Sequence, residues 1–160
     1  MEHLTKLIQN RTPDVSDRDI YEGLAIDVST ELGVDLVSIW LFDDAYTKIK
    51  CVFSLDRNHR VQLTGAELLK SQYPTYFKAI IEEITIMATD VHTHHSTKEL
   101  SKDYFQKNGI QSLLDYIIYN ELKPVGVICC ETTACQRRWA EDDIYRIRLL
   151  TVAAGFELSL

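Results

Sequence analysis

The segment that decides the fold begins Ser112-Leu113-Leu114-Asp115-Tyr116-Ile117-Ile118-Tyr119 and ends at Trp139. A turn at Asn120-Glu121-Leu122-Lys123 follows the first apolar run, and residues 125–132 then read Val-Gly-Val-Ile-Cys-Cys-Glu-Thr. Two such runs separated by a short turn predict an antiparallel hairpin. Arg137-Arg138-Trp139 precedes a helical pattern that starts near Glu141.

Composition restricts the class of protein. The 160 residues are about one domain's worth, and 46% hydrophobic with 26% charged residues is typical of a globular protein. No apolar run reaches the roughly 20 residues of a membrane-spanning helix. Residues 1–6 lack the basic start and apolar centre of a signal peptide, so we expect a cytoplasmic location. The net charge of −7 opposes binding to nucleic acid or to an anionic membrane, whose phosphates would be repelled.

Hydrophobic periodicity predicts helices at both ends of a group of strands. Ser16 and Asp19 form a capping-box pattern that starts a helix, and Gly33 is a natural stop. We expect strands at 36–42, 49–55, 60–63, 85–88, 112–119 and 125–132, and helices at 66–72, 73–83, about 96–109 and from 141 onward. This order predicts an α+β fold, an antiparallel sheet of five or six strands with helices packed on it. Residues 1–15 form a helical extension, ending around Pro13, and 16–160 form the domain.

Several short segments share their order and spacing with a known family. They are Ser38 to Phe42, Tyr73 to Phe77, Asp90, Tyr104, Gly109-Ile110, Ser112 to Asp115, Gly126 to Glu131 and Arg137 to Trp139. Together they resemble, over residues 18–158, the GAF domains of bacterial sensor histidine kinases and diguanylate cyclases. The resemblance implies a cytoplasmic regulatory module, usually dimeric. Its sheet would carry the N- and C-terminal helices on one face and a ligand-holding cover of loops and short helices on the other.

Two subgroups of that family do not match this chain. The cyclic-nucleotide subgroup is marked by an Asn-Lys pair, which the stretch Glu131-Thr132-Thr133 lacks. The bilin-binding subgroup attaches its pigment through a Cys-His dipeptide, and the sequence contains none. The ligand or cofactor is therefore unknown at this stage.

The register of the hairpin indicates which face could hold a ligand. Pairing across the 120–123 turn sets Ile117 against Gly126 and Leu113 against Cys130. Gly126 permits close approach by a helix, so its face, which includes Asp115, is expected to carry the terminal helices. The opposite face and its lid would then supply the ligand-binding residues: Trp40, Tyr73, Tyr76, Phe77, Tyr104, Tyr116, Cys129 and Glu131. The alternative is that these aromatic residues merely fill a core.

Asp115 needs a partner if it is buried. We expect a structural ion pair with Arg137, or with its neighbour Arg138.

Two other groups of residues invite a functional interpretation. His92, His94 and His95 could hold a divalent metal, but adjacent histidines rarely bind one ion, so we predict no metal site. The cysteines at 51, 129, 130 and 135 contain no CxxC pair, which favours reduced and mostly buried thiols.

The final helix has a second apolar stripe, formed by Tyr145, Leu149, Val152 and Phe156. Its four-three-four spacing is typical of a helix–helix seam and predicts a homodimer interface. Leu158-Ser159-Leu160 ends without a capping residue, so we expect the natural chain to continue into an output domain such as a kinase or cyclase.

The sequence favours a non-catalytic sensor that binds a small molecule and shifts the packing of its terminal helices. One alternative is a dimerisation module without a ligand. Another is a GAF-fold enzyme that reduces free methionine sulfoxide through cysteines, although no nucleophile–base pair is evident.

Overall fold

The computed structural model describes residues 1–10, 12 and 14–158. Pro13 and residues 159–160 lie outside these residues. The predicted end of the helical extension, at Pro13, and the expected continuation of the chain after residue 160 are therefore not described. The elements are α1 (Glu2–Gln9), α2 (Asp17–Leu32), β1 (Leu36–Phe42), β2 (Lys48–Asp56), β3 (Glu67–Leu69), α3 (Pro74–Glu83), β4 (Thr85–Ala88), the 3-10 turn η1 (Lys98–Leu100), the π-helical turn η2 (Ser101–Phe105), α4 (Gln106–Asn108), β5 (Ser112–Asn120), β6 (Lys123–Thr132) and α5 (Glu141–Glu157).

The strands form one antiparallel six-stranded sheet in the order β3-β2-β1-β6-β5-β4. The predicted α+β fold is confirmed. The capping box of α2 is also present, with Ser16 and Asp19 bonded to each other's backbone and Gly33 in the left-handed conformation. None of the described helices is long and apolar enough to cross a bilayer.

Two predicted elements in the middle of the chain are wrong. Residues 60–63 form no strand, and the helix expected over 66–72 is replaced by the short strand β3. Pairing with β2 and an ion pair between Lys48 and Glu67 hold this segment extended, so tertiary contacts override its helical propensity.

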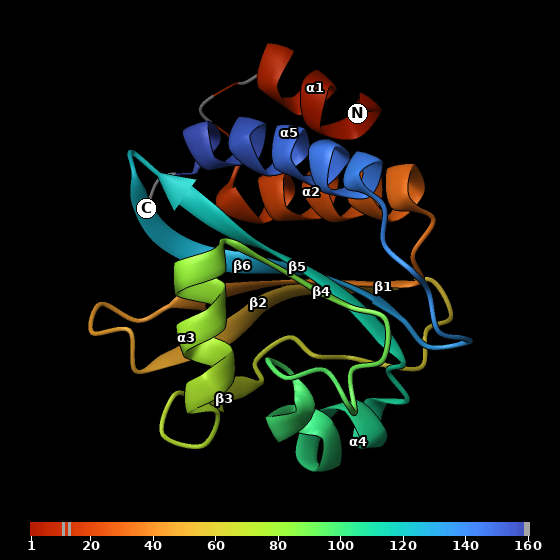
Figure 1. Ribbon diagram of the computed structural model, residues 1–160. Helices are drawn as coiled ribbons and strands as arrows, with labels where there is room; N and C mark the ends of the chain where they lie inside the picture. The colour runs from red at the N-terminus through yellow and green to blue at the C-terminus, as the bar shows by residue number, and fades with distance from the viewer. Residues whose placement is uncertain (11, 13, 159–160) are drawn as a thin grey trace.

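One face of the sheet carries the terminal helices. Figure 1 shows α2 and α5 side by side on the sheet, with α1 outside them. Val37 and Ile39 from β1 and Ile128 and Cys130 from β6 pack against these helices. Gly126 lies on this face as predicted, but the group that crowds it is not a helix. A Cβ there would lie 2.2 Å from the carbonyl oxygen of Trp40 on β1.

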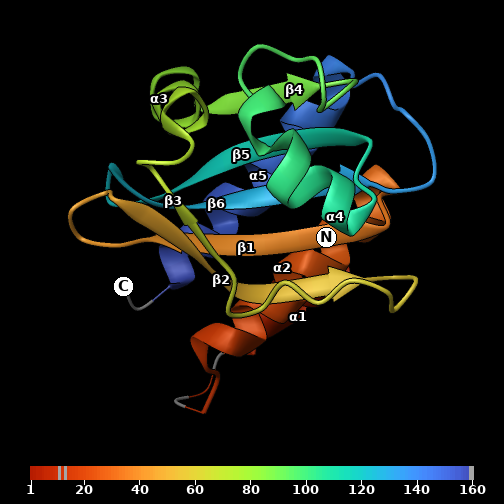
Figure 2. The same cartoon turned by 90° about the horizontal axis from the view of Figure 1, so that it is seen from below.

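The opposite face is covered by α3 and the segment from η1 to α4, which we call the cover. In Figure 2 the segment from η1 to α4 lies over the middle strands of the sheet and α3 lies beside the edge strand β4, both away from α2 and α5. The helix expected over 96–109 is divided here into η1, η2 and α4. Ser96 does not cap it, because the Ser96 hydroxyl has no partner and Glu99 bonds elsewhere.

Candidate functional site

The β5–β6 hairpin has a register one residue away from the predicted one. A bulge between Ile118 and Tyr119 places Ile118, rather than Ile117, opposite Gly126. The two turn residues, Glu121 and Leu122, have φ values of 48° and 70°, as in the primed turns that two-residue hairpins prefer. Because side chains alternate along a strand, this single step reverses the face of every residue before the bulge on β5.

The reversal overturns two predictions about β5. Asp115 lies opposite Cys129 and shares the covered face with Leu113 and Glu131. Tyr116 lies on the other face, where it packs against the cluster that the terminal helices form with the sheet, which we call the terminal-helix cluster, and not beneath the cover. Asp115 and Glu131, which we call the acid pair, are therefore diagonal neighbours on adjacent strands, at a typical Cα separation of roughly 7 Å.

Each member of the acid pair accepts a hydrogen bond from a tyrosine of the cover. The Tyr76 hydroxyl on α3 donates to Asp115 Oδ2 at 2.6 Å, and the Tyr104 hydroxyl on η2 donates to Glu131 Oε1 at 3.2 Å. Asp115 and Glu131 are only 1% and 0% exposed, so bulk solvent does not reach their other oxygens. Asp115 Oδ1 and Glu131 Oε2 have no hydrogen-bond partner.

Burial also changes the acidity of this cluster. It raises the pKa of Asp115 to about 7, against an opposing effect of the Tyr76 and Cys129 hydrogen bonds. Burial and the nearby Asp115 raise the pKa of Glu131 well above its usual range, so this carboxyl holds its proton at neutral pH. The same burial raises the pKa of the Cys129 thiol and keeps it protonated.

The predicted ion pair between Asp115 and Arg137 is absent. Arg137 instead binds Asp143 at 2.8 Å and donates to the carbonyl oxygen of Leu32, and its guanidinium lies 4.7 Å from the Trp139 ring centroid. Arg137 therefore joins the C-terminal end of α2 to the first turn of α5 and does not serve the acid pair. Arg138 is not the partner either, since Asp115 Oδ2 bonds Tyr76 and Oδ1 is unpaired.

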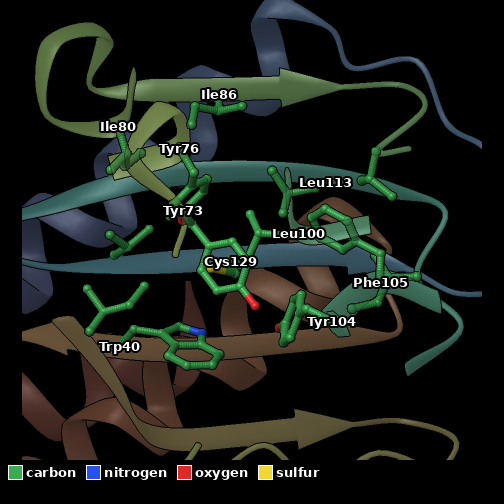
Figure 3. Packing of buried hydrophobic residues seen from close by; sticks show 14 of the residues in the cluster. Trp40, Tyr73, Tyr76, Ile80, Ile86, Leu100, Tyr104, Phe105, Leu113 and Cys129 are labelled. Carbon is green, nitrogen blue, oxygen red and sulfur yellow. The ribbon is translucent and has the colours of Figure 1, made fainter. Parts of the chain in front are cut away.

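Aromatic side chains close over the acid pair. Figure 3 shows Tyr73, Tyr76 and Tyr104 gathered around Cys129, with Trp40 beside them. A void of about 10 Å³ remains, close to the smallest space that holds one water. Its lining consists of Trp40, Leu68, Tyr76, Leu100, Tyr104, Phe105, Leu113, Asp115, Cys129 and Glu131.

The structure thus brings together most of the predicted ligand-binding residues. Trp40, Tyr76, Tyr104, Cys129 and Glu131 line the void, while Tyr73 and Phe77 pack in the same cluster without reaching it. The sequence prediction missed Leu113 and its strand neighbour Asp115, Leu68 on β3, and the cover residues Leu100 and Phe105. Leu113 changes face for the same reason as Asp115, and Leu68 lies in the segment that was predicted to be helical. Asp115 could have been found only by recognising the bulge, and Leu100 and Phe105 by placing the short turns of the cover.

A carboxylate holds the two parts of the cover together. Glu99 on η1 accepts hydrogen bonds from the Thr75 backbone N–H at 3.0 Å and from the Thr75 hydroxyl at 2.6 Å. It thereby satisfies backbone donors in the first turn of α3, which has no side-chain cap of its own. Tyr76 and Tyr104, one from each part, are positioned by this connection.

The histidine loop forms internal contacts. His92 Nδ1 lies 2.6 Å from Ser101 Oγ, and the rings of His94 and His95 stack with centroids 4.4 Å apart. Across the described residues, no group of three or more His, Cys, Asp or Glu side chains is placed to hold a metal ion. All four cysteines are free, and of these only Cys135 is exposed.

The second apolar stripe of α5 faces outward. The exposed fractions are 60% for Tyr145, 42% for Leu149, 49% for Val152 and 80% for Phe156. A groove of about 280 Å³ lies beside it, between α5 and the β5–β6 hairpin, and includes Leu122, which is 95% exposed. We call these four α5 residues the α5 stripe.

Comparison with known proteins agrees with this geometry. The GAF domain family model matches residues 18–158. Among solved structures, the phycocyanobilin-bound GAF domain from a cyanobacterial phytochrome has a TM-score of 0.78 and 16% identity, covering 96% of this chain and 88% of that one. The blue-light absorbing form of the Thermosynechococcus elongatus PixJ GAF domain has a TM-score of 0.77 and 16% identity, with coverages of 88% and 83%.

A third similar structure comes from a different kind of protein. The GAF domain of the Acinetobacter phosphoenolpyruvate-protein phosphotransferase has a TM-score of 0.71 and 17% identity, covering 96% of this chain and 89% of that one. At such identities the likeness establishes the fold alone. Comparison with curated proteins finds no match.

Proposed function

The chain belongs to the GAF domain family, and on that premise we propose that it is a small-molecule-sensing regulatory domain of a cytoplasmic signal-transduction protein. In this proposal the domain is non-catalytic. The ligand binds between the covered face of the sheet and the cover, and it alters the packing of α2 and α5. An output domain such as a kinase or cyclase would receive the signal.

The acid pair is the observation that carries this proposal. Burying a carboxyl group without a full set of hydrogen bonds is costly, and a core needs no such groups for packing. Here two lie side by side, each with one oxygen that bonds to nothing. Both face a void bounded by short cover elements rather than by long helices. Such a cluster of perturbed groups is typical of a binding site.

The alternation of β5 offers a path from this site to the helices. Asp115 faces the cover, while its chain neighbours Leu114 and Tyr116 pack against the terminal-helix cluster. A displacement of Asp115 by a ligand therefore moves side chains that contact the helices. Close to the end of β5, the Tyr119 carbonyl oxygen would lie only 2.3 Å from a Cβ at Gly155, so α5 follows this strand closely.

The proposed ligand is not a bilin, although one similar structure contains phycocyanobilin. No cysteine lies on the cover to attach a pigment, because Cys51 belongs to β2, Cys129 and Cys130 to β6, and Cys135 follows β6. The void of about 10 Å³ is also far below the several hundred Å³ of typical ligand pockets. Any ligand must displace part of the cover, and a large pigment would displace most of it.

We further propose that the α5 stripe forms a homodimer interface, because four large side chains on one helix face are left outside the core. This surface also favours the second candidate function, a dimerisation module without a ligand. The reductase alternative has less support. Burial raises the pKa of Cys129 and Cys130 well above the usual value, and protonated buried thiols are poor nucleophiles.

A thermal-shift screen of metabolites, followed by hydrogen exchange, tests the sensing role. A ligand should raise Tm and protect the amides of residues 73–108, and the replacement Asp115→Asn should weaken both effects. Glu121→Gln, on the exposed hairpin turn, serves as the matched control. If no metabolite changes Tm or the exchange of the cover, the sensing role is rejected in favour of the dimerisation module.

A further inference from the structure

The chemistry of the acid pair narrows the class of ligand, provided that the sensing role proposed above is correct. We propose that the ligand carries a protonated primary amine, which binds between Asp115 Oδ1 and Glu131 Oε2, with its carbon skeleton against Trp40 and the cover aromatics.

The hydrogen-bond inventory calls for a donor. Tyr76 and Tyr104 already direct their only O–H donors at the two carboxyls. The indole N–H of Trp40 is bonded to Ser38 Oγ at 2.8 Å. The side chains around the void thus offer free acceptor oxygens and, apart from the weak donor of Cys129, no free donor except the carboxyls' own protons. A ligand that only accepts hydrogen bonds could pair with these carboxyls only through their protons, whereas a donor can bond to the free oxygens in either protonation state.

The charge of the lining points the same way. The ten described residues around the void include two acids and no lysine, arginine or histidine. A phosphate or carboxylate ligand would meet no positive group there, and it would be repelled by the acid pair once either carboxyl is ionised. An ammonium group, in contrast, supplies a cation that stabilises the ionised form of the two buried carboxyls. It also forms charge-assisted hydrogen bonds to them, which are stronger than hydrogen bonds between neutral groups.

The aromatic side chains present suitable surfaces for a cationic nitrogen. Trp40 and Tyr104 meet edge to face with ring centroids 6.0 Å apart, and Tyr104 packs similarly against Phe105 at 5.3 Å. Trp40 presents only ring surface to the void, because its N–H is bonded within β1. Aromatic faces attract ammonium groups by about 0.5–2 kcal/mol, which complements the acid pair.

The available space fits the head of such a ligand. A void of about 10 Å³ holds one water-sized group, and an ammonium group is of that size. The remaining carbon atoms need room that only the cover can give. Tyr76 and Tyr104 lie on its two separate parts, so an entering amine parts them where Glu99 now connects η1 to α3.

Matched small probes test the inference with the full chain. Phenethylamine, 2-phenylethanol and phenylacetate share an aromatic skeleton but differ in charge, as do butylamine, butanol and butyrate. We expect the two amines to raise Tm and to protect residues 73–108 from hydrogen exchange. The alcohols and acids should need at least a tenfold higher concentration for the same effects.

Variants and proton counting complete the test. The double replacement Asp115→Asn with Glu131→Gln keeps shape and removes charge, so it should weaken amine binding roughly 10- to 100-fold. The control Glu121→Gln should not change it. Calorimetry near pH 6 in two buffers should show net proton release, because the cation drives both carboxyls to ionise.

The outcomes separate this inference from the sensing role. Amines that bind no better than the alcohols, or that bind equally to the double variant, overturn the amine assignment. Binding of an alcohol or acid probe beneath the cover would do the same while supporting a ligand site. If none of the six probes binds, the amine assignment is also overturned. The metabolite screen then decides whether the domain has a sensing role.

Discussion

Replacing Asp115 by asparagine is expected to stabilise the protein at neutral and alkaline pH. In the unfolded chain the carboxyl ionises near its ordinary pKa of 3.8, whereas in the folded protein the pKa is about 7. Between these values the unfolded state has already lost a proton that the folded state still binds. The free energy of unfolding therefore falls as pH rises from about 4 to about 7 and is then level.

The size of this effect follows from the difference between the two values. Each pH unit over which the proton is bound only in the folded state is equivalent to about 1.4 kcal/mol, so a span of roughly three units amounts to about 4 kcal/mol. The introduced asparagine would have no charge to bury, and its side-chain oxygen could still accept from Tyr76. We expect little difference from the native protein near pH 4 and a variant more stable by up to about 4 kcal/mol at pH 8.

Urea unfolding followed by tryptophan fluorescence at pH 4.5, 6 and 8 measures this directly. The groups that face Asp115 are Glu131, Tyr76, Tyr104 and Cys129, and each keeps a raised pKa in the folded protein. Glu131 contributes a fall in stability of the same sign. Because the nearby Asp115 raises the pKa of Glu131, the difference between native protein and variant contains the titration of Asp115 together with its effect on Glu131. A difference that does not grow from pH 4.5 to pH 8 would refute the reasoning.

Three other variants, one of them a double replacement, test separate parts of the structure. The pair Leu149→Glu and Phe156→Glu should convert the proposed dimer to monomer in sedimentation, because both side chains are exposed on the α5 stripe. Asp27→Ala should detach α1 and make its amides exchange rapidly, at a cost of about 1–2 kcal/mol, because the Asp27 carboxylate accepts from first-turn N–H groups of α1. Gly155→Ala should lower stability by about 1–3 kcal/mol in thermal unfolding, since the added Cβ meets the Tyr119 carbonyl oxygen at 2.3 Å.

Each of these has a control and a contradicting result. Glu82→Gln, exposed on α3 and away from the groove beside α5, should stay dimeric, and a dimer that survives the α5 replacements rejects the stripe as the interface. Asp14→Ala, in the segment between α1 and α2, should leave α1 protected; equal exchange in both variants would contradict the capping role of Asp27. Gly33→Ala serves as the control for Gly155→Ala, because Gly33 has a left-handed backbone but a Cβ there would meet no other atom. A Gly155→Ala variant as stable as the native protein would show that α5 can move away from β5.

Much of the fold could be predicted because its signals are local. The Ser16–Asp19 capping box and the stop at Gly33 bounded α2, and the alternation of Val37 and Ile39 with Trp40 identified the two faces of β1. Neighbouring residues alone determine these features, so a sequence pattern contains them. The antiparallel sheet, its five longer strands and the terminal helices are confirmed for the same reason, whereas the elements predicted over 60–63 and 66–72 are wrong.

The site depended on contacts between residues distant in the chain. The bulge at Ile118–Tyr119 reversed the faces of β5, and it brought Asp115 to Glu131 while moving Tyr116 to the helices. The apolar sequence of β5 does not indicate this change of register, because both faces of β5 are buried and hydrophobic side chains are buried in either register. The amino-acid sequence by itself thus determined the terminal helices, α3 and the five longer strands, in their order along the chain. Only the tertiary structure decided which side chains meet, since a one-residue change of pairing costs little locally and reverses an entire strand.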